Sequence, residues 1–218
     1  MRPHQLLPLL CLFGCATAVT DPDTDAGTRD AAADSAAADT GTKPDGGAPD
    51  SGSSSCTTPF SGTLMTFDFT GELGTQSSTM PKSAAPGVTA GNISRAQPLM
   101  AVVGANSINA TNWATSAQLD GTRYFTFSLT ADPSCALDVS SITLDVKAIG
   151  TGPTQAAIAT SGDGFKQTSP FSANSAGPVA VSVVGASALE VRIYGYGASA
   201  TTGTMRVQNV LTVTGVLR

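Results

Sequence analysis

Apolar and polar side chains alternate with a period of two over residues 56–218, and this alternation leaves the chain few ways to fold. The apolar positions are Met65, Phe67 and Phe69; Phe125, Phe127 and Leu129; Ile142, Leu144 and Val146; Val179, Val181 and Val183; Leu189, Val191 and Ile193; Met205 and Val207; and Leu211 and Val213. Successive side chains of a strand point to opposite faces of its sheet, so each stretch predicts a strand with one buried face.

Turns that contain glycine or proline separate these stretches, for example Pro86-Gly87 and Gly150–Pro153. Short strands divided by such turns are typical of antiparallel all-β domains. The 163 residues from Cys56 to Arg218 are enough for one domain, which would bury about 70% of the surface of its unfolded chain. We therefore predict an all-β fold over residues 56–218, a two-sheet antiparallel β-sandwich of jelly-roll type.

Residues 1–14 have the layout of a secretory signal, because Arg2 precedes an apolar run from Leu6 to Gly14. The run is too short to span a bilayer, which takes about 20 apolar residues. Leu12-Phe13-Gly14-Cys15 resembles a bacterial lipobox, in which signal peptidase II cuts before the cysteine and its thiol then carries a diacylglycerol. The resemblance implies a lipoprotein acylated at Cys15 with palmitate-type chains and held at the outer membrane or cell surface.

Ordinary secretion is the alternative. Phe13 departs from the small or β-branched residue usual in a lipobox, and Ala16-Thr17-Ala18 satisfies the small-x-small rule of signal peptidase I. Cleavage there would release a soluble protein that begins at Val19.

Residues 15–55 are predicted to be an acidic, disordered linker between the lipid anchor and the sandwich. From Val19 to Ser55 there is no aromatic residue and no Ile, Leu or Met, and eight aspartates stand against Arg29 and Lys43. So little apolar surface cannot offset the entropy lost on ordering. Repulsion between like charges is expected to extend this segment.

The composition of residues 56–218 excludes several functions. This part of the chain has eight acidic and eight basic residues, a balance that gives no electrostatic case for nucleic acid. The single histidine, His4, lies in the predicted signal. A mature chain without histidine has no Ser-His-Asp triad and no histidine-bearing zinc or copper site. We predict no enzymatic activity and no cofactor. A bound structural calcium ion is the alternative.

Cys56 and Cys135 are the two cysteines of the predicted sandwich. In an exported protein a disulfide between them is the default expectation. Two free thiols, one at the junction with the linker and one in a turn, are the alternative.

Several segments occur together in an order that resembles an uncharacterised β-sandwich domain of bacterial exported proteins, including proteins with PEP-CTERM-type or other C-terminal surface-sorting signals. The segments are Phe67–Gly71, Val88–Arg95, Trp113 with Asp120 and Tyr124–Phe127, Gly152-Pro153 with Ser161–Phe165, Val191–Tyr196, Gly203–Met205 and Asn209-Val210. The resemblance implies an extracytoplasmic jelly roll and no established reaction. Two departures are the lack of a sorting helix before Arg218, for which the lipid at Cys15 would substitute, and Gln208 where relatives often have aspartate.

A binding face is predicted on the strand around residues 189–196. If its apolar positions face inward, the alternate residues face outward and can meet a glycan with aromatic, charged and hydroxyl groups. The candidate residues are Glu190, Arg192, Tyr194 and Tyr196, with Tyr124 and Trp113 as further aromatics. Core packing of the tryptophan, and tyrosines that merely cover a sheet edge, are the alternatives.

The opposing hypothesis is a structural or adhesive envelope protein whose sandwich binds no small molecule. Asp120 and Asp163 lie in predicted loops and are weak candidates for a paired-carboxylate or calcium site. Aspartates in turns more often accept hydrogen bonds from their own backbone. The predicted partners are thus a membrane, through the lipid, and a glycan or another envelope component.

Mass spectrometry of the mature N-terminus tests the anchor. We expect a chain that begins at Cys15 and carries diacylglycerol, with two or three acyl chains that each add about 0.8 kcal/mol per buried methylene to membrane binding. A free amine on Val19 would show instead that signal peptidase I processes the chain.

Overall fold

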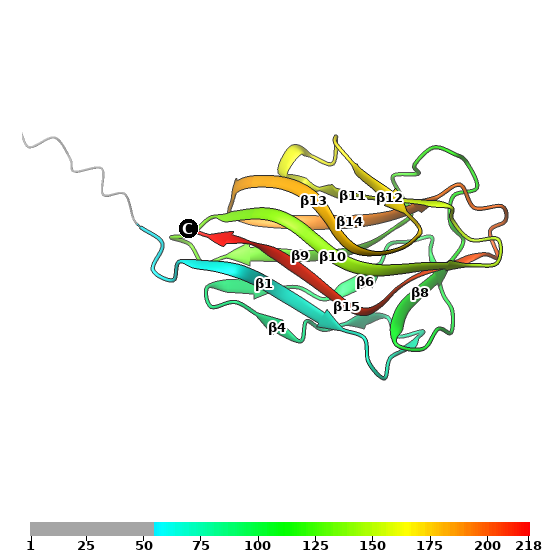
Figure 1. The fold of residues 1–218 in the computed structure, drawn as a ribbon, viewed down its shortest axis with the longest axis horizontal. Coiled ribbons are helices and arrows are strands. Elements are labelled where there is room, and N and C mark those ends of the chain that lie inside the picture. Colours follow the sequence, from blue (N-terminus) through cyan, green and yellow to red (C-terminus); the bar gives the residue numbers. More distant parts are fainter. Residues whose placement is uncertain (1–54) are drawn as a thin grey trace, which may run out of the picture. The chain divides into compact units, whose positions relative to one another are not determined.

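The computed structural model describes residues 55–218, and these residues form two β-sheets packed face to face (Figure 1). The predicted signal, Cys15 and the linker up to residue 54 lie outside the described residues. The helical element of the described part is a 3-10 turn, η1 (Ser161–Asp163). Within residues 55–218 no helix is long and apolar enough to cross a membrane.

Eight principal strands build the sandwich. They are β1 (Phe60–Asp68), β9 (Tyr124–Ala131), β10 (Leu137–Ile149), β11 (Gln155–Thr160), β12 (Ser169–Ser172), β13 (Asn174–Ala186), β14 (Ala188–Tyr196) and β15 (Thr204–Leu217). Sheet 1 has the order β1-β15-β10-β13, and sheet 2 has the order β9-β14-β11-β12. In chain order the first strand pairs with the eighth, the second with the seventh, the third with the sixth and the fourth with the fifth, all antiparallel. This is the pairing of a jelly roll, and the predicted fold is confirmed.

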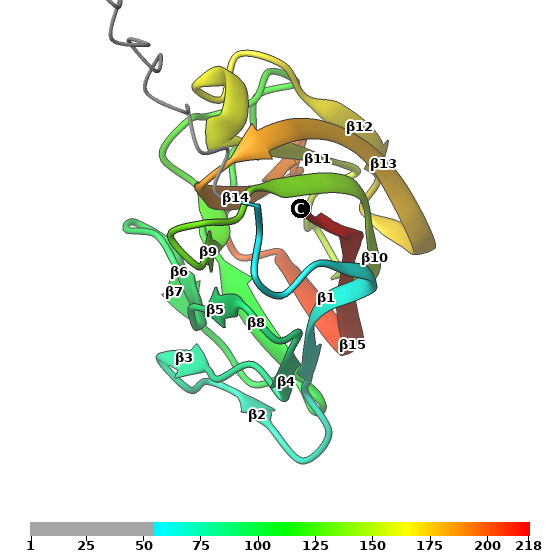
Figure 2. The same ribbon diagram turned by 90° about the vertical axis from the view of Figure 1, so that its left-hand side faces the viewer.

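Seven short strands between β1 and β9 widen both sheets. They are β2 (Leu73–Gly74), β3 (Ser78–Thr79), β4 (Ser83–Ala84), β5 (Val88–Ala90), β6 (Ile93–Arg95), β7 (Met100–Ala101) and β8 (Ser107–Thr111). In sheet 1, β4 pairs with β1, and β8 pairs with β15, β2 and β7; in sheet 2, β5 and β6 pair with β9, and β3 with β6. Figure 2 shows the two layers from the end, with β1, β15 and β10 on one side and β14, β9 and β6 on the other.

The core lies between the sheets, where the predicted alternation places it. The inward positions of β1, β9, the first part of β10, β14 and β15 are buried, with Phe67, Phe125 and Ile193 among those of zero exposure. On β13 only Val183 is buried, whereas Val179 and Val181 are half-buried. These two valines are less covered because β13 is the outermost strand of sheet 1.

Arg95 joins the two sheets along one flank. From β6 of sheet 2 its Nε donates to the carbonyl oxygen of Asn109 on β8 of sheet 1 at 2.7 Å. Its Nη1 donates to the carbonyl of Gln76 at 2.5 Å, and its Nη2 donates to the carbonyl of Gly74. Burial lowers the pKa of Arg95. These backbone acceptors replace the water that the half-buried guanidinium has lost.

Cys56 and Cys135 form a disulfide, as predicted. The bond joins the segment before β1 to the turn between β9 and β10, across a sequence separation of 79 residues. The disulfide therefore holds the first residues of the sandwich to a turn that is distant along the chain.

Replacing Cys56 and Cys135 together by serine should lower the free energy of unfolding by about 2–4 kcal/mol, because the unfolded chain regains the freedom of a long closed loop. Urea unfolding of the double variant measures this loss, and reduced wild-type protein should match the variant. An unchanged unfolding midpoint would mean that the disulfide does not form in the protein.

Candidate functional site

Strand β14 presents a charged and aromatic strip on the outer face of sheet 2. Leu189, Val191 and Ile193 point into the core and are at most 1% exposed. Glu190 and Arg192 therefore point outward, as the alternation predicts, and both are partly exposed. Their neighbours come from β9, which pairs with β14, and from the loop that follows η1.

Arg192 is the centre of this strip. Its guanidinium lies over the ring of Tyr124 at 4.4 Å and over the ring of Phe165 at 3.7 Å. Its Nε donates to Glu190 Oε1 at 2.7 Å, and the same oxygen accepts a hydrogen bond from Thr126 Oγ1 at 3.1 Å. Burial lowers the pKa of Arg192, but hydrogen bonds with Glu190 and Tyr194 outweigh it and the pKa is raised. A guanidinium between two rings, with a carboxylate at its edge, is a pre-organised cation.

Phe165 was not foreseen from the sequence as part of a site. It follows the Gly162-Asp163-Gly164 turn and has a left-handed backbone, with φ of 62°. Asp163 holds this loop, because its carboxylate accepts hydrogen bonds from the backbone N–H groups of Lys166 and Gln167. The available signal was an aromatic residue directly after a glycine-rich turn, which marks a position but not the strand it will contact.

Two aromatic residues of the predicted binding face, Tyr194 and Trp113, are buried. Tyr194 lies on the outer side of β14 but is only 3% exposed, with its ring packed edge-to-face on Tyr124 at 5.4 Å. Burial raises its pKa. Trp113 has zero exposure, donates from Nε1 to the carbonyl of Ala110 and packs edge-to-face on Phe125. Neither ring is free to stack on a ligand, whereas Tyr124 and Tyr196 are partly exposed.

A shallow depression borders the Glu190 end of the strip. It has a volume of about 320 Å³ and is lined by Asn92, Thr126, Phe127, Ser128 and Glu190. An amide, two hydroxyl groups and a carboxylate are the groups that fix the hydroxyls of a bound sugar, since the amide and the hydroxyls can donate and accept hydrogen bonds and the carboxylate accepts them.

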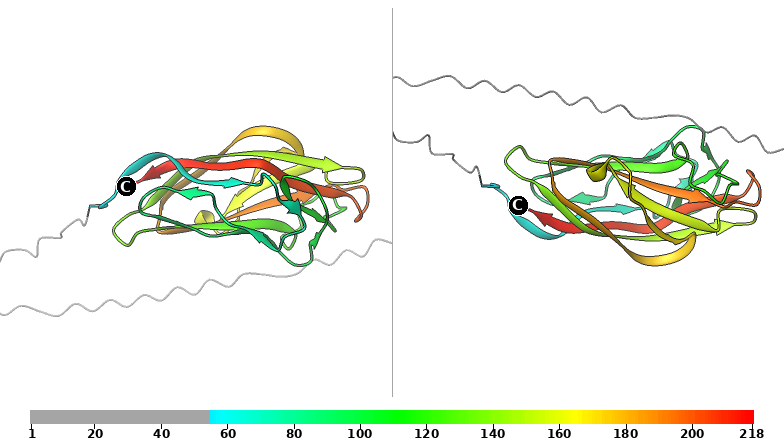
Figure 3. Two further views of the ribbon diagram at one scale, coloured as in Figure 1. Left: turned by 90° about the horizontal axis from the view of Figure 1, so that it is seen from below. Right: turned by 90° about the horizontal axis from the view of Figure 1, so that it is seen from above.

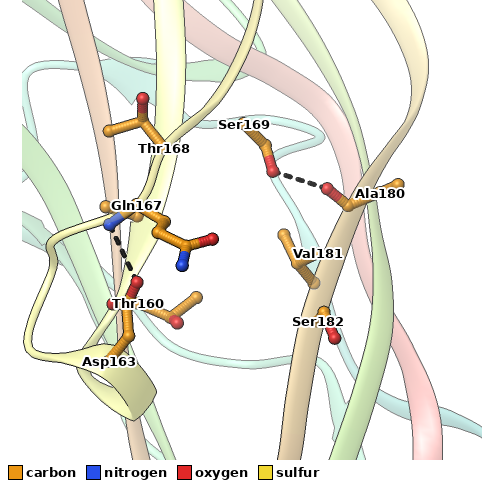
Figure 4. A pocket seen from close by; sticks show the side chains of 9 residues that line it. Thr160, Asp163, Gln167, Thr168, Ser169, Ala180, Val181 and Ser182 are labelled. Atoms are coloured by element: carbon orange, nitrogen blue, oxygen red, sulfur yellow. Dashed lines mark hydrogen bonds between the residues drawn. The ribbon is translucent and has the colours of Figure 1, made fainter.

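A second cavity, of about 250 Å³, opens on the flank of the sandwich between the η1–β12 segment and β13. Figure 4 shows Gln167 and Thr168 on one side of it and Val181 and Ser182 on the other. Ser169 Oγ donates to the carbonyl of Ala180 at 2.6 Å and ties the two sheet edges together. The loop that carries Phe165 also supplies Asp163 and Gln167 to the lining of this cavity.

Asp120 and Asp163 stabilise their own loops. Asp120 accepts hydrogen bonds from the N–H and Oγ1 of Thr122 and from Arg123 Nε, at 2.7 to 2.9 Å. Hydrogen bonds from Thr122 lower the pKa of its carboxyl. Among residues 55–218 no group of three or more histidine, cysteine, aspartate or glutamate side chains is placed to hold a metal ion. These bonds fit the turn-forming interpretation, and the calcium hypothesis stays a prediction.

Comparison with protein-family models, curated proteins and solved structures gives no match to this chain. A fold shared by many unrelated functions does not assign one. The function is therefore argued from the site.

Arg192→Ala should lower the free energy of unfolding by about 1–2 kcal/mol, because two aromatic contacts of a partly desolvated cation are lost. Arg192→Lys should recover only part of this, because an ammonium group cannot stack on two rings as a planar guanidinium does. Lys166→Ala, in the adjacent loop, is the matched control and should leave stability unchanged within about 0.5 kcal/mol. If lysine restores full stability in urea unfolding, stacking of the guanidinium is not what stabilises the strip.

Proposed function

We propose that this chain is a non-catalytic domain displayed at the bacterial cell envelope, with a structural or adhesive role. The observation that carries the proposal is the use of its carboxylates. Asp68 pairs with Lys82 at 2.5 Å, Asp138 with Arg218 at 2.5 Å, and Glu190 with Arg192 at 2.7 Å.

The pKa values of the Asp68 and Asp138 carboxyls argue in the same direction. A general acid at neutral pH needs a raised pKa. The pKa of Asp68 is lowered by the hydrogen bond from Lys82, and that of Asp138 by the hydrogen bond from Arg218. Asp145 accepts hydrogen bonds from the side-chain amides of Gln208 and Asn209. These carboxylates act as structural acceptors, which suits a rigid displayed domain better than a hydrolase.

Display at the envelope rests on the N-terminal sequence. The lipobox-like segment that ends at Cys15, followed by an acidic linker, supports a tethered domain. The Cys56–Cys135 disulfide fits an oxidising compartment outside the cytosol. Release after Ala18 would give the same domain in secreted form.

Glycan binding is the second candidate, and the strip on sheet 2 favours it. Its revised residues are Tyr124, Phe165, Arg192 and Glu190, beside the depression lined by Asn92 and Ser128. Aromatic rings provide apolar faces for sugar rings, and the carboxylate and amide would bind hydroxyl groups. Jelly rolls include lectin domains, although this is an analogy of fold alone.

Retention on a panel of insoluble polysaccharides tests both candidates. We expect wild-type protein to bind at least one glycan, with an affinity that Phe165→Ala reduces about tenfold through loss of one aromatic contact. Phe165→Tyr keeps the ring and should keep the binding.

The two candidates fail separately in this experiment. If wild-type protein is retained on no polysaccharide, glycan binding is excluded and a protein partner or a purely structural role remains. Release of new reducing ends from any polysaccharide would overturn the non-catalytic proposal itself.

A further inference from the structure

The outer face of sheet 1 brings together two cations that are far apart in the sequence. Lys147 on β10 and Arg206 on β15 are direct cross-strand partners. Both point outward, because the adjacent residues Val146 and Val207 are buried. Directly opposed side chains of an antiparallel pair lie about 5 Å apart at their Cβ atoms, so the two positive charges repel each other.

Neither cation has an anionic partner in the described part of the chain. The ion pairs among residues 55–218 use four other cations, Lys82, Arg123, Arg192 and Arg218, at 2.5–2.8 Å. Asp145 lies two residues before Lys147 on the same face, but its Oδ2 accepts hydrogen bonds from Gln208 Nε2 at 3.0 Å and Asn209 Nδ2 at 2.6 Å. Arg206 Nε is buried and has no hydrogen-bond partner.

Amide side chains flank the two cations in the same row across the sheet. Asn174 on β13 is the cross-strand partner of Lys147, and Asn109 on β8 is the partner of Arg206. A depression of about 250 Å³ beside Lys147 is lined by Asp145, Lys147, Asn174 and Ser175, among others. Asn109 is itself committed to the neighbouring loop, because its Nδ2 donates to the carbonyl of Val103 at 2.9 Å.

We propose that Lys147 and Arg206 form a binding site for an oxyanion group, a carboxylate, sulfate or phosphate, which is free in solution or carried by an acidic polysaccharide. One oxyanion between the two side chains would replace their repulsion by two charge-assisted hydrogen-bonding contacts, and the guanidinium fork suits a bidentate contact. The site is separate from the strip on sheet 2, so it holds whether or not that strip binds a glycan.

The pair lies at one end of the sandwich. Lys147 lies near the end of β10 and Arg206 near the start of β15. Figures 1 and 3 show that these strand ends lie at the far end of the sandwich from the C-terminus and the start of β1. The pair therefore lies at the end of the sandwich opposite the start of β1.

Thermal unfolding of the purified protein in sulfate, in phosphate and in chloride of equal ionic strength tests the site. The variants are Lys147→Gln and Arg206→Gln, with Lys166→Gln as a control that removes an exposed lysine from the loop after η1. In chloride at low salt, Lys147→Gln should melt above wild type, because the repulsion is gone. In sulfate the order should reverse, because only the intact pair gains stability from a bound anion.

A second measurement separates the two sources of the anion. On an immobilised polyuronate, Lys147→Gln and Arg206→Gln should bind about tenfold more weakly than wild type, and Lys166→Gln should bind like wild type. Specific stabilisation by sulfate without retention on polyuronate would support the site and assign it to a small free anion.

Three results would overturn the proposal. The first is an equal response to sulfate in all four proteins, which would be general salt stabilisation. The second is a loss of polyuronate binding in Lys166→Gln as large as in Lys147→Gln. The third is a combined result: Arg206→Gln destabilises the protein equally in every anion, and Lys147→Gln responds to the anions like wild type. Arg206 would then stabilise the fold through its neighbours, such as its cross-strand partner Asn109, and would not bind a ligand.

Discussion

The antiparallel pairing of β1 with β15 is the contact on which the rest of the sandwich depends. It joins the first and last principal strands, with Phe60 opposite Leu217 at one end and Asp68 opposite Val210 at the other. Each inner pair of strands forms within this outer pair, so the jelly roll closes only when the two ends of the domain meet. The Cys56–Cys135 disulfide acts near the Phe60–Leu217 pair. Beside the disulfide, Ala136 and Arg218 exchange backbone hydrogen bonds. Long-range closure of this kind carries a large entropic cost, which the covalent link reduces.

Charge in this domain is used mainly for internal structure. Arg95 bridges the two sheets through backbone carbonyls, Arg218 holds Asp138 beside the last strand, and Arg192 lies between two aromatic rings. A domain with equal numbers of acids and bases can satisfy most of its charges in this way. Lys147 and Arg206 stand out against this pattern because they face each other and neither forms an ion pair within residues 55–218. This contrast, rather than the number of basic residues, is what makes them candidates for a ligand.

Some of the candidate site could be read from one strand, and some depended on contacts between strands. The outward direction of Glu190 and Arg192 followed from local alternation, because side-chain direction along a strand is a property of the backbone. The burial of Tyr194 did not follow, since it depends on the ring of Tyr124 on the neighbouring strand, which packs edge-to-face against it. Trp113 lies in the core, which was the alternative interpretation of this residue. Phe165 reaches Arg192 only because a left-handed turn redirects its loop.

Alternation, turn residues and the two cysteines of residues 56–218 were enough to predict an antiparallel sandwich stabilised by one disulfide, because strand period and turn preference are local properties. Histidine content and charge balance support the prediction that this domain uses no histidine-based catalysis and binds no nucleic acid, and both stay predictions. Strand register was decided only in three dimensions, by the fit of the buried side chains across two sheets. That register places Lys147 opposite Arg206 and Tyr124 beside Arg192, pairs that have no signature in the linear sequence because each joins residues brought together only by the long-range pairing of strands.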